Sequence, residues 1–237
     1  MKISVCIPMY NEASIIEDTA RTLSDYMSAN FNDYEILFSD DGSRDGCGDM
    51  VRALALPNVR VVGYAQNQGK GCAVRTAMLE SCGDVVMFTD ADLAYGTEVI
   101  GRIYRIFEKN GDTDIVIGSR NIAKDGYEGY TFMRKLASKA YIKVLCIAGG
   151  LKLSDSQTGC RAFSGKAAKD IFSRCTVNGF AFDFEAILWA QKLGYKFTEM
   201  PVKVINHRES KVRLVRDTFR MLRDLRKMKK RIKNAEI

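Results

Sequence analysis

Residues 85–93 read VVMFTDADL, a short apolar run that ends in two carboxylates one residue apart. The run 85–88 has the length and composition of a buried strand, and Asp90 and Asp92 follow at its carboxyl end. Open α/β sheets bind ligands at that edge. Hard oxygen donors suit Mg²⁺ or Mn²⁺, which takes few carboxylates and completes its shell with water and phosphate oxygens. The alternative for this pair is a solvated turn or a helix N-cap.

Strand-like runs alternate with helical patterns through the first half of the chain, which predicts βαβ units and a mostly parallel sheet. The expected strands cover 3–8, 34–39, 59–64, 85–89 and 114–118, and the expected helices between them cover 12–29, 45–54, 71–80 and 97–109. In the less regular second half we expect helices over 131–148 and 182–193, a strand over 195–205 with Pro201 at a sheet edge, and a last helix from Lys211. We therefore expect one α/β domain over 1–210 and a basic tail over 211–237.

Composition narrows the class of protein. The chain has 237 residues and 46% hydrophobic content, but no apolar stretch approaches the roughly 18 residues that a transmembrane helix needs. Seven scattered cysteines without a C-x-x-C pair favour reduced thiols, and a single histidine excludes a multi-histidine metal centre. The sequence enters a strand at once, without a charged and then apolar leader, so we expect a cytoplasmic protein.

Polar residues also follow the first three expected strands. These groups are Tyr10–Glu12, Asp40–Gly46 and Asn67–Gly71. A nucleotide lying across the strand ends would meet the flat ring of Tyr10 and acceptor oxygens of Glu12, Asp40 and Asp41. Its pyrophosphate would then reach a metal ion at Asp92. Taken singly, the first group is an ordinary helix start, the second a type I turn, and the third lacks the spacing of a P-loop.

The order of these motifs resembles family 2 glycosyltransferases of the GT-A fold. The motifs are IPMYNE at 7–12, DDGSRDG at 40–46, NQGKG at 67–71 and DADL at 90–93. Further motifs resemble the dolichyl- and polyprenyl-phosphate sugar synthases, the glucosyl branch more closely than the mannosyl branch. They are GSR at 118–120, DSQTGCRAF at 155–163, GFAFDFE at 179–185 and ESK at 209–211.

This resemblance implies an inverting hexosyl transfer from a nucleotide sugar, UDP-glucose or GDP-mannose, to polyprenyl phosphate. By position, the nucleoside contacts are Pro8, Tyr10, Glu12 and Asp41, with Asp40 beside them. Asp90 and Asp92 would hold nucleotide and a Mg²⁺ or Mn²⁺ ion, and we expect Lys70 and Ala91 among the nucleotide contacts. The acceptor phosphate would bind Arg120, Arg134 and Ser138, and the donor pyrophosphate would bind Lys211. Ala94 stands where some mannosyl enzymes have a metal-binding Gln.

The acceptor decides whether a general base is needed. A phosphate monoester is largely dianionic near neutral pH and is its own nucleophile, whereas a hydroxyl acceptor requires a base. The downstream candidates for a base are Asp183 and Glu185. The alternative is that these two carboxylates only provide negative charge at the start of a helix. A family 2 enzyme acting on a soluble saccharide or another hydroxyl acceptor is therefore the second hypothesis.

The segment from Lys211 to the end carries eleven basic and three acidic residues, so it holds the excess behind the chain's net charge of +7. One helical stripe in it is apolar, comprising Val215, Phe219, Leu222, Leu225 and Ile232. Such a helix lies on an anionic membrane surface, so we expect peripheral association with the inner membrane face. The alternative is that the stripe docks on the protein's own core. Nucleic acid is not an expected partner, because aromatic residues are not interleaved with the basic ones.

Overall fold

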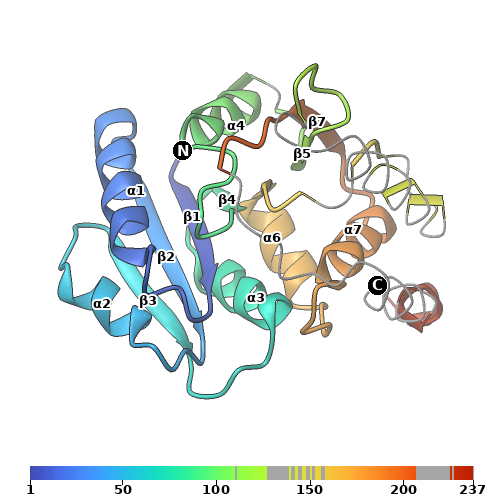
Figure 1. Ribbon diagram of the computed structural model, residues 1–237. Helices are drawn as coiled ribbons and strands as arrows, with labels where there is room; N and C mark the ends of the chain where they lie inside the picture. Colours follow the sequence, from blue (N-terminus) through green and yellow to red (C-terminus); the bar gives the residue numbers. More distant parts are fainter. Residues whose placement is uncertain are drawn as a thin grey trace.

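The computed structural model describes residues 1–109, 111–126, 139, 142–143, 146–147, 150, 153–155, 158–206, 225 and 227–236. Its strands are β1 (Ile3–Met9), β2 (Tyr34–Asp41), β3 (Val59–Tyr64), β4 (Val85–Phe88), β5 (Ile115–Ser119), β6 (Arg161–Ser164) and β7 (Phe197–Pro201). Its helices with described bounds are α1 (Ile16–Asn30), α2 (Cys47–Ala53), α3 (Lys70–Glu80), α4 (Glu98–Lys109), α6 (Gly165–Phe172) and α7 (Phe182–Lys192). The strands form one sheet in the order β3-β2-β1-β4-β6-β5-β7, with helices on both faces (Figure 1).

The sheet is covered on both sides because its strands alternate apolar side chains between two cores. Ile3, Val5 and Ile7 of β1 pack with α1, α2 and α4, whereas Cys6 faces the core that includes α3, α6 and α7. Strands buried on both faces read as continuous apolar runs, which is why β1, β2 and β4 could be found from the sequence. The expected α/β class and mostly parallel sheet are confirmed.

Strand order reverses at the centre of the sheet. The chain places β2 and then β3 on one side of β1, and it returns to place β4 on the other side, with all these pairs parallel. β6 was not among the expected strands, and it runs antiparallel to both β4 and β5. β7 is one of the two edge strands and ends at Pro201, as expected for a proline that cannot donate to the ladder.

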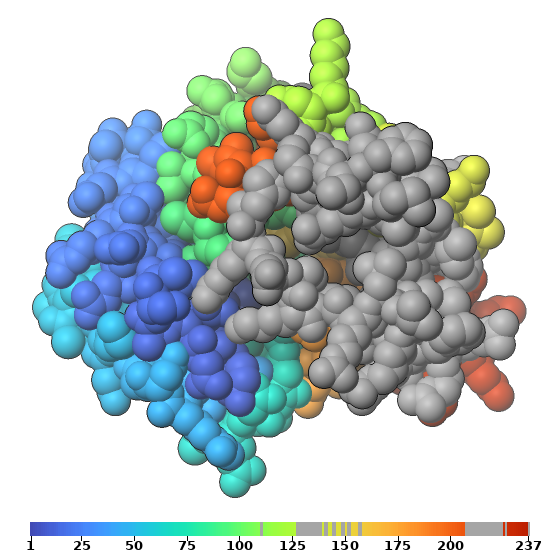
Figure 2. Space-filling model, viewed as in Figure 1, coloured from blue at the N-terminus to red at the C-terminus, as the bar shows by residue number. Residues whose placement is uncertain are grey.

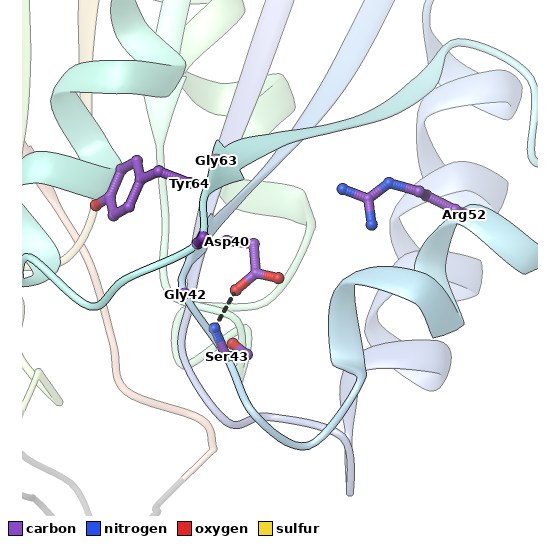
Figure 3. Close-up of a pocket in the computed structure, with 7 residues that line it drawn as sticks. Asp40, Gly42, Ser43, Arg52, Gly63 and Tyr64 are labelled. Atoms are coloured by element: carbon purple, nitrogen blue, oxygen red, sulfur yellow. Dashed lines mark hydrogen bonds between the residues drawn. The ribbon is translucent and has the colours of Figure 1, made fainter.

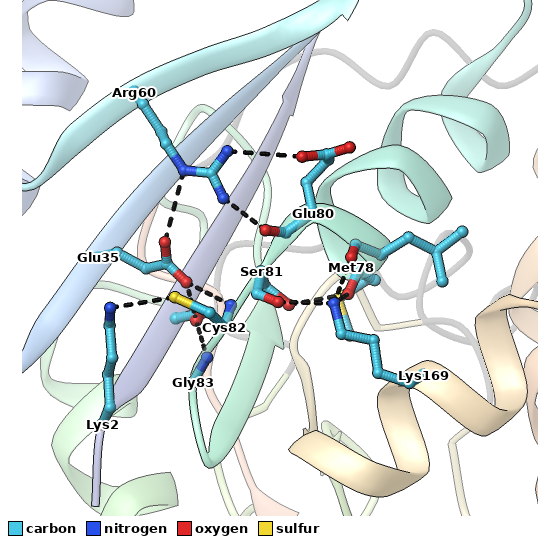
Figure 4. Close-up of polar contacts among 11 residues, drawn as sticks. Lys2, Glu35, Arg60, Met78, Glu80, Ser81, Cys82, Gly83 and Lys169 are labelled. Atoms are coloured by element: carbon cyan, nitrogen blue, oxygen red, sulfur yellow. Dashed lines mark hydrogen bonds and ion pairs between the residues drawn. The ribbon is translucent and has the colours of Figure 1, made fainter.

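A polar network ties the amino-terminal end of the sheet to the end of α3 (Figure 4). Glu35 accepts hydrogen bonds from Ser4 Oγ at 2.5 Å and from the Cys82 backbone N–H at 2.6 Å. Burial would raise the pKa of Glu35, but these hydrogen bonds and Arg60 outweigh it and lower the pKa. Lys169 of α6 donates to the carbonyl of Ser81 at 2.6 Å. These groups fix the end of the sheet opposite Asp90 and leave the carboxyl end for the site.

The cysteines are spread through the core of the domain. All seven are free, and six are buried, with Cys82 as the exposed exception. Burial raises the pKa of Cys160 to about 12, so this thiol stays protonated inside the core.

Two residues of the expected membrane stripe lie in the described end of the basic tail. Residues 227–234 are helical, and Leu225, Met228 and Ile232 are buried in the core that contains α6 and α7. Leu225 and Ile232 therefore pack on the protein itself, which is the alternative that the sequence left open. The other stripe residues and the expected domain boundary at 210/211 lie outside the described residues. Within the described part of the chain, no helix has the length and apolar character needed to cross a membrane.

Candidate active site

The site lies at the point where the strand order reverses. β1 and β4 are parallel neighbours, so the residues that follow them emerge side by side at the carboxyl edge of the sheet. Tyr10 follows β1, and Asp90 and Asp92 follow β4. In open α/β sheets, ligands bind in the crevice at the carboxyl ends of the strands, at the point where the strand order reverses. The topology thus brings the first and fourth predicted motifs together.

The turn after β4 is held by its own backbone and by a distant segment. Leu93 has a φ of 48°, its N–H donates to the Asp90 carbonyl at 3.0 Å, and Asp92 Oδ1 accepts from the Ala94 N–H at 3.1 Å. Asn206 Nδ2 donates to the Asp92 carbonyl at 3.0 Å. The segment after β7 therefore lies against this turn, as the contact between orange and green atoms shows in Figure 2. These bonds fix the backbone of the turn and one oxygen of the Asp92 carboxylate.

Lys70 makes a close ion pair with the first of these carboxylates. Its Nζ lies 2.5 Å from Asp90 Oδ1, and both side chains are about 30% exposed. Burial lowers the pKa of Lys70, but the negative charges of Asp90, Asp183 and Asp92 outweigh this effect and raise the pKa. The ammonium is therefore charged, and it stands where a diphosphate bound beside Asp92 would need a cation.

A second ion pair, which is more deeply buried, interacts electrostatically with this one. Arg161 Nη1 of β6 lies 2.5 Å from Asp183 Oδ1 in the first turn of α7, and the Arg161 side chain is 1% exposed. Burial raises the pKa of Asp183 to about 6, although the charges of Arg161 and Lys70 oppose the shift. Asp183 is thus a helix-start residue, as its alternative interpretation held, and also part of the charged cluster around Lys70. Arg161 was not among the expected site residues, because its strand β6 was not expected.

Asp41 supports the loop that presents Lys70. Its carboxylate is buried and accepts hydrogen bonds from Tyr64 Oη at 2.7 Å, Asn67 Nδ2 at 2.8 Å, and the N–H groups of Gln68 and Gly69 at 2.8 and 3.0 Å. Four donors fix the loop because a buried carboxylate must be satisfied by such bonds. The predicted contact of Asp41 with the nucleoside stays a prediction.

Asp40 points in another direction, into a pocket of about 310 Å³ beside α2 (Figure 3). Its Oδ1 accepts from the Ser43 N–H at 2.9 Å, and its carboxylate lies between Ser43 and Arg52 in this view. The pocket is lined by Asp40, Gly42, Ser43, Arg52, Gly63, Tyr64 and Ala65. Tyr10 is 38% exposed, whereas Pro8 and Ala91 are buried, and the Ala91 carbonyl accepts from Thr19 Oγ1 at 2.7 Å.

Arg120 is held in a fork at the end of β5. Its Nε and Nη2 donate to the two oxygens of Asp155 at 2.8 and 3.1 Å, and Asp155 is fully buried. This bidentate pair fixes the plane of the guanidinium. Arg134, Ser138 and Lys211, the other residues expected at phosphates, lie outside the described residues.

Asp90 and Asp92 fit a magnesium or manganese ion better than a metal that requires a protein cage. Among the described residues, no group of three or more His, Cys, Asp or Glu side chains is placed to hold a metal. Two carboxylates from one turn suit a cation that retains water and binds substrate phosphates. Gly159 makes room for this arrangement, because a Cβ there would lie 2.2 Å from Asp90 Oδ2.

A family model for glycosyl transferase family 2 matches residues 4–172. The chain belongs to this family. It is 29% identical to a dolichyl-phosphate beta-glucosyltransferase from Dictyostelium discoideum, over 94% of this chain and 72% of that protein. It is also 29% identical to dolichyl-phosphate beta-glucosyltransferase ALG5D from Trichomonas vaginalis, over 85% of this chain and 65% of the relative. Glycosyltransferase AglD from Haloferax volcanii is again 29% identical, over 93% of this chain but only 36% of that protein.

Solved structures show the same fold. Glucosyl-3-phosphoglycerate synthase from Mycobacterium tuberculosis, in complex with Mn²⁺, UDP and glucosyl-3-phosphoglycerate, superposes with a TM-score of 0.68 at 20% identity, over 98% of this chain and 79% of that one. Mannosyl-3-phosphoglycerate synthase from Rubrobacter xylanophilus gives a TM-score of 0.64 at 19% identity, over 98% of this chain and 73% of that one. The expected GT-A fold and the resemblance to the glucosyl branch are confirmed, and the protein is a glycosyltransferase.

Proposed function

We propose that this glycosyltransferase transfers glucose from UDP-glucose to a polyprenyl phosphate, with inversion at the anomeric carbon and with Mg²⁺ or Mn²⁺. The observation that carries the proposal is the turn with Asp90 and Asp92 at the strand-order reversal, facing the Lys70 ammonium. The names of the relatives from Dictyostelium and Trichomonas support the lipid phosphate acceptor and glucose. The UDP, UDP-glucose and Mn²⁺ complexes of the fold relatives support the donor and the metal.

The donor half of the site uses the first four motifs. Pro8, Tyr10 and Glu12, with Asp40 beside them, contact the nucleoside. Asp90 and Asp92 hold the cation, and Lys70 contacts the diphosphate. Asp41 acts by fixing the loop before Lys70, since its oxygens already accept four protein hydrogen bonds. When bound, the cation neutralises negative charge on the departing diphosphate. Lys70, and Lys211 from the C-terminal segment, add to that neutralisation.

The acceptor half centres on Arg120. A guanidinium whose plane is fixed by Asp155 is suited to orient a phosphate. An oxygen of the dianionic phosphate attacks the anomeric carbon, the bond from that carbon to the diphosphate oxygen breaks, and UDP leaves with the electron pair. No proton moves in this step, so it needs no base. Arg134 and Ser138 complete the phosphate site in this proposal.

One observation favours the second candidate, a hydroxyl acceptor. Asp183 belongs to the charged cluster near Lys70, and its pKa is raised to about 6. A general base works best with a pKa near the operating pH, so Asp183 is the carboxylate that would remove the hydroxyl proton. The pairing of Asp183 with Arg161 favours a structural role instead.

Transfer assays with separate donors test the proposal. UDP-glucose, UDP-galactose, UDP-N-acetylglucosamine and GDP-mannose are each offered with polyprenyl phosphate in detergent and with Mg²⁺ or Mn²⁺. We expect a lipid-linked product from UDP-glucose alone, and loss of it with a chelator or with Asp92→Asn. The matched control is Asp49→Asn, because Asp49 is 87% exposed in a surface pair with Arg52. If none of the four donors gives a product with polyprenyl phosphate, the result would contradict the proposal.

Asp183→Asn separates the two acceptor classes. With polyprenyl phosphate as acceptor we expect kcat to stay within about tenfold, whereas loss of a general base costs about 10²–10⁴-fold. A loss of that size in a variant that remains folded and still binds UDP would favour the hydroxyl acceptor.

The basic segment supports a peripheral membrane contact made by charge. Leu225 and Ile232 are buried in the protein, so we assign the contact to lysine and arginine residues that attract anionic headgroups. The protein should sediment with phosphatidylglycerol vesicles at low salt and remain in the supernatant at high salt. Equal binding to neutral phosphatidylcholine vesicles would contradict this assignment.

A further inference from the structure

Glu185 is a buried carboxylate that has no part in the proposed chemistry. It lies in the first turn of α7, two residues after Asp183, and it is completely buried. Its oxygens accept hydrogen bonds from the backbone N–H groups of Thr176, at 2.9 Å, and Val177, at 2.7 Å. Glu185 therefore fixes the loop that leads into α7.

The cation that pairs with Glu185 comes from the other end of the chain. Arg231, in the C-terminal helical residues 227–234, donates to Glu185 Oε1 and to Thr176 Oγ1. Among the ion pairs of the described residues, Arg231 is the one cation that meets this carboxylate. Figure 1 shows the red C-terminal helix beside α7. A buried carboxylate needs such a partner, because an uncompensated buried charge costs several kcal/mol.

The loop that Glu185 fixes also determines where α3 begins. The Asn178 carbonyl accepts from the N–H of Gly71 at 2.7 Å, in the first turn of α3. The approach is close, since a Cβ on Gly71 would lie 2.5 Å from the Val177 carbonyl oxygen. Lys70, the first residue of α3, therefore receives its position from this loop on one side and from the Asp41-bound loop on the other.

We propose that Arg231 and Glu185 are positioning residues for Lys70. The contacts run from Arg231 to Glu185, then to the 176–178 loop, then to the first turn of α3 and the Lys70–Asp90 pair. Through them the C-terminal helix sets the geometry of the donor site without touching the donor. The inference rests on the proposed function only for the role of Lys70 as a donor contact.

Hydrogen exchange tests the contacts without any ligand. Arg231→Met should speed amide exchange at Thr176, Val177 and Gly71 by about tenfold, the size of coupling common between contacting residues. Arg231→Lys, which keeps the cation, should restore much of the protection. Lys192→Met is the matched control, because Lys192 donates to the Ile232 carbonyl at 2.6 Å but lies two turns beyond Glu185. It also loosens the C-terminal helix, yet it should leave Gly71 exchange within about twofold.

Nucleotide binding provides the second measurement. With Mn²⁺ present, Arg231→Met should weaken UDP binding by about tenfold at unchanged stoichiometry, while Lys192→Met should not. Equal effects of the two variants on Gly71 exchange and UDP affinity would overturn the inference and leave a general stabilising role for the C-terminal helix. If the unmodified protein binds no nucleotide, the proposed function fails, and the exchange data still decide whether Arg231 positions α3.

Discussion

Lys70 Nζ lies 2.5 Å from Asp90 Oδ1, and this ion pair joins the start of α3 to the turn after β4. Asp90 therefore pairs with a cation from the neighbouring motif, while Asp92 lies two residues further along the same turn. Lys70 follows the loop that Asp41 fixes, and Asp90 packs against Gly159. A nucleotide and its metal ion would enter a site whose charges are already arranged.

Replacing the lysine should separate metal binding from nucleotide binding. Lys70→Met removes a positive charge beside Asp90, so a divalent cation alone should bind more tightly. UDP should bind about tenfold more weakly, because hydrogen bonds to charged groups contribute about 1.5–3 kcal/mol. Electron paramagnetic resonance of free Mn²⁺ and calorimetry with UDP measure the two effects. Lys166→Met, at the exposed Lys166–Asp170 pair, is the control. Weaker binding of Mn²⁺ alone to Lys70→Met would contradict the prediction.

The ionisation of Asp183 should lower stability as the pH rises from about 4 to 6. Its pKa is about 6 in the folded protein, whereas an unfolded chain ionises near 4. The unfolded state therefore loses this proton first, and the free energy of unfolding falls over that interval by roughly 3 kcal/mol, then levels off. Asp183→Asn should lack this contribution. Urea unfolding of both proteins from pH 4.5 to 8 measures the difference, and parallel curves would show that Asp183 has an ordinary pKa.

Breaking the Arg120 fork should destabilise the fold. Asp155→Asn removes one charge of a largely buried ion pair with Arg120, which typically costs about 3–5 kcal/mol. The comparison is Asp49→Asn, which removes an exposed ion pair and should change stability by about 0.5 kcal/mol or less. Chemical denaturation of the two variants gives both values. Similar small values for the two would show that the buried pair contributes no more than a surface pair.

The packing of the C-terminal helix can be tested at Ile232. Its side chain is buried against the core with α6 and α7, so Ile232→Ala should cost about 2–4 kcal/mol of stability in the absence of membranes. Lys233→Ala, at the next and exposed position, should be nearly neutral. Thermal unfolding without lipid distinguishes the two outcomes. A stripe that only contacts membranes would leave both variants as stable as the unmodified protein.

Gly71 should tolerate no side chain. Its Cβ would lie 2.5 Å from the backbone oxygen of Val177 and 2.6 Å from Phe182 Cβ, so Gly71→Ala must displace the start of α3. We expect a loss of about 1–3 kcal/mol in stability and weaker UDP binding. At Gly179, in the same loop region, a Cβ would meet no atom within 4 Å, so Gly179→Ala is the control. An effect of equal size at both positions would contradict this account of the contact.

The part of the fold that could be predicted depends on consecutive elements. β1 to β4 follow one another through helical crossovers, and their buried runs are continuous, so strand positions and the shared carboxyl edge could be read from residues 3–93. β6 has four residues, one of them Arg161, and it is stabilised by pairing with β4 and β5 from distant parts of the chain. Such a strand carries no periodic signal of its own.

The order of the strands is enough to place the carboxylates of the second and fourth motifs at one sheet edge, since parallel strands end together. The contacts of each carboxylate depend on how the whole chain packs. This packing buries Asp41 among loop donors, pairs Asp90 with Lys70, and pairs Asp183 with Arg161, a strand residue 22 positions away. Leu225 and Ile232 are likewise buried in the protein core. An amphipathic stripe shows that an apolar surface must be covered, but it does not show whether the protein core or a membrane covers it. Partners distant in sequence are chosen by the packing of whole elements, and that packing is not a local property.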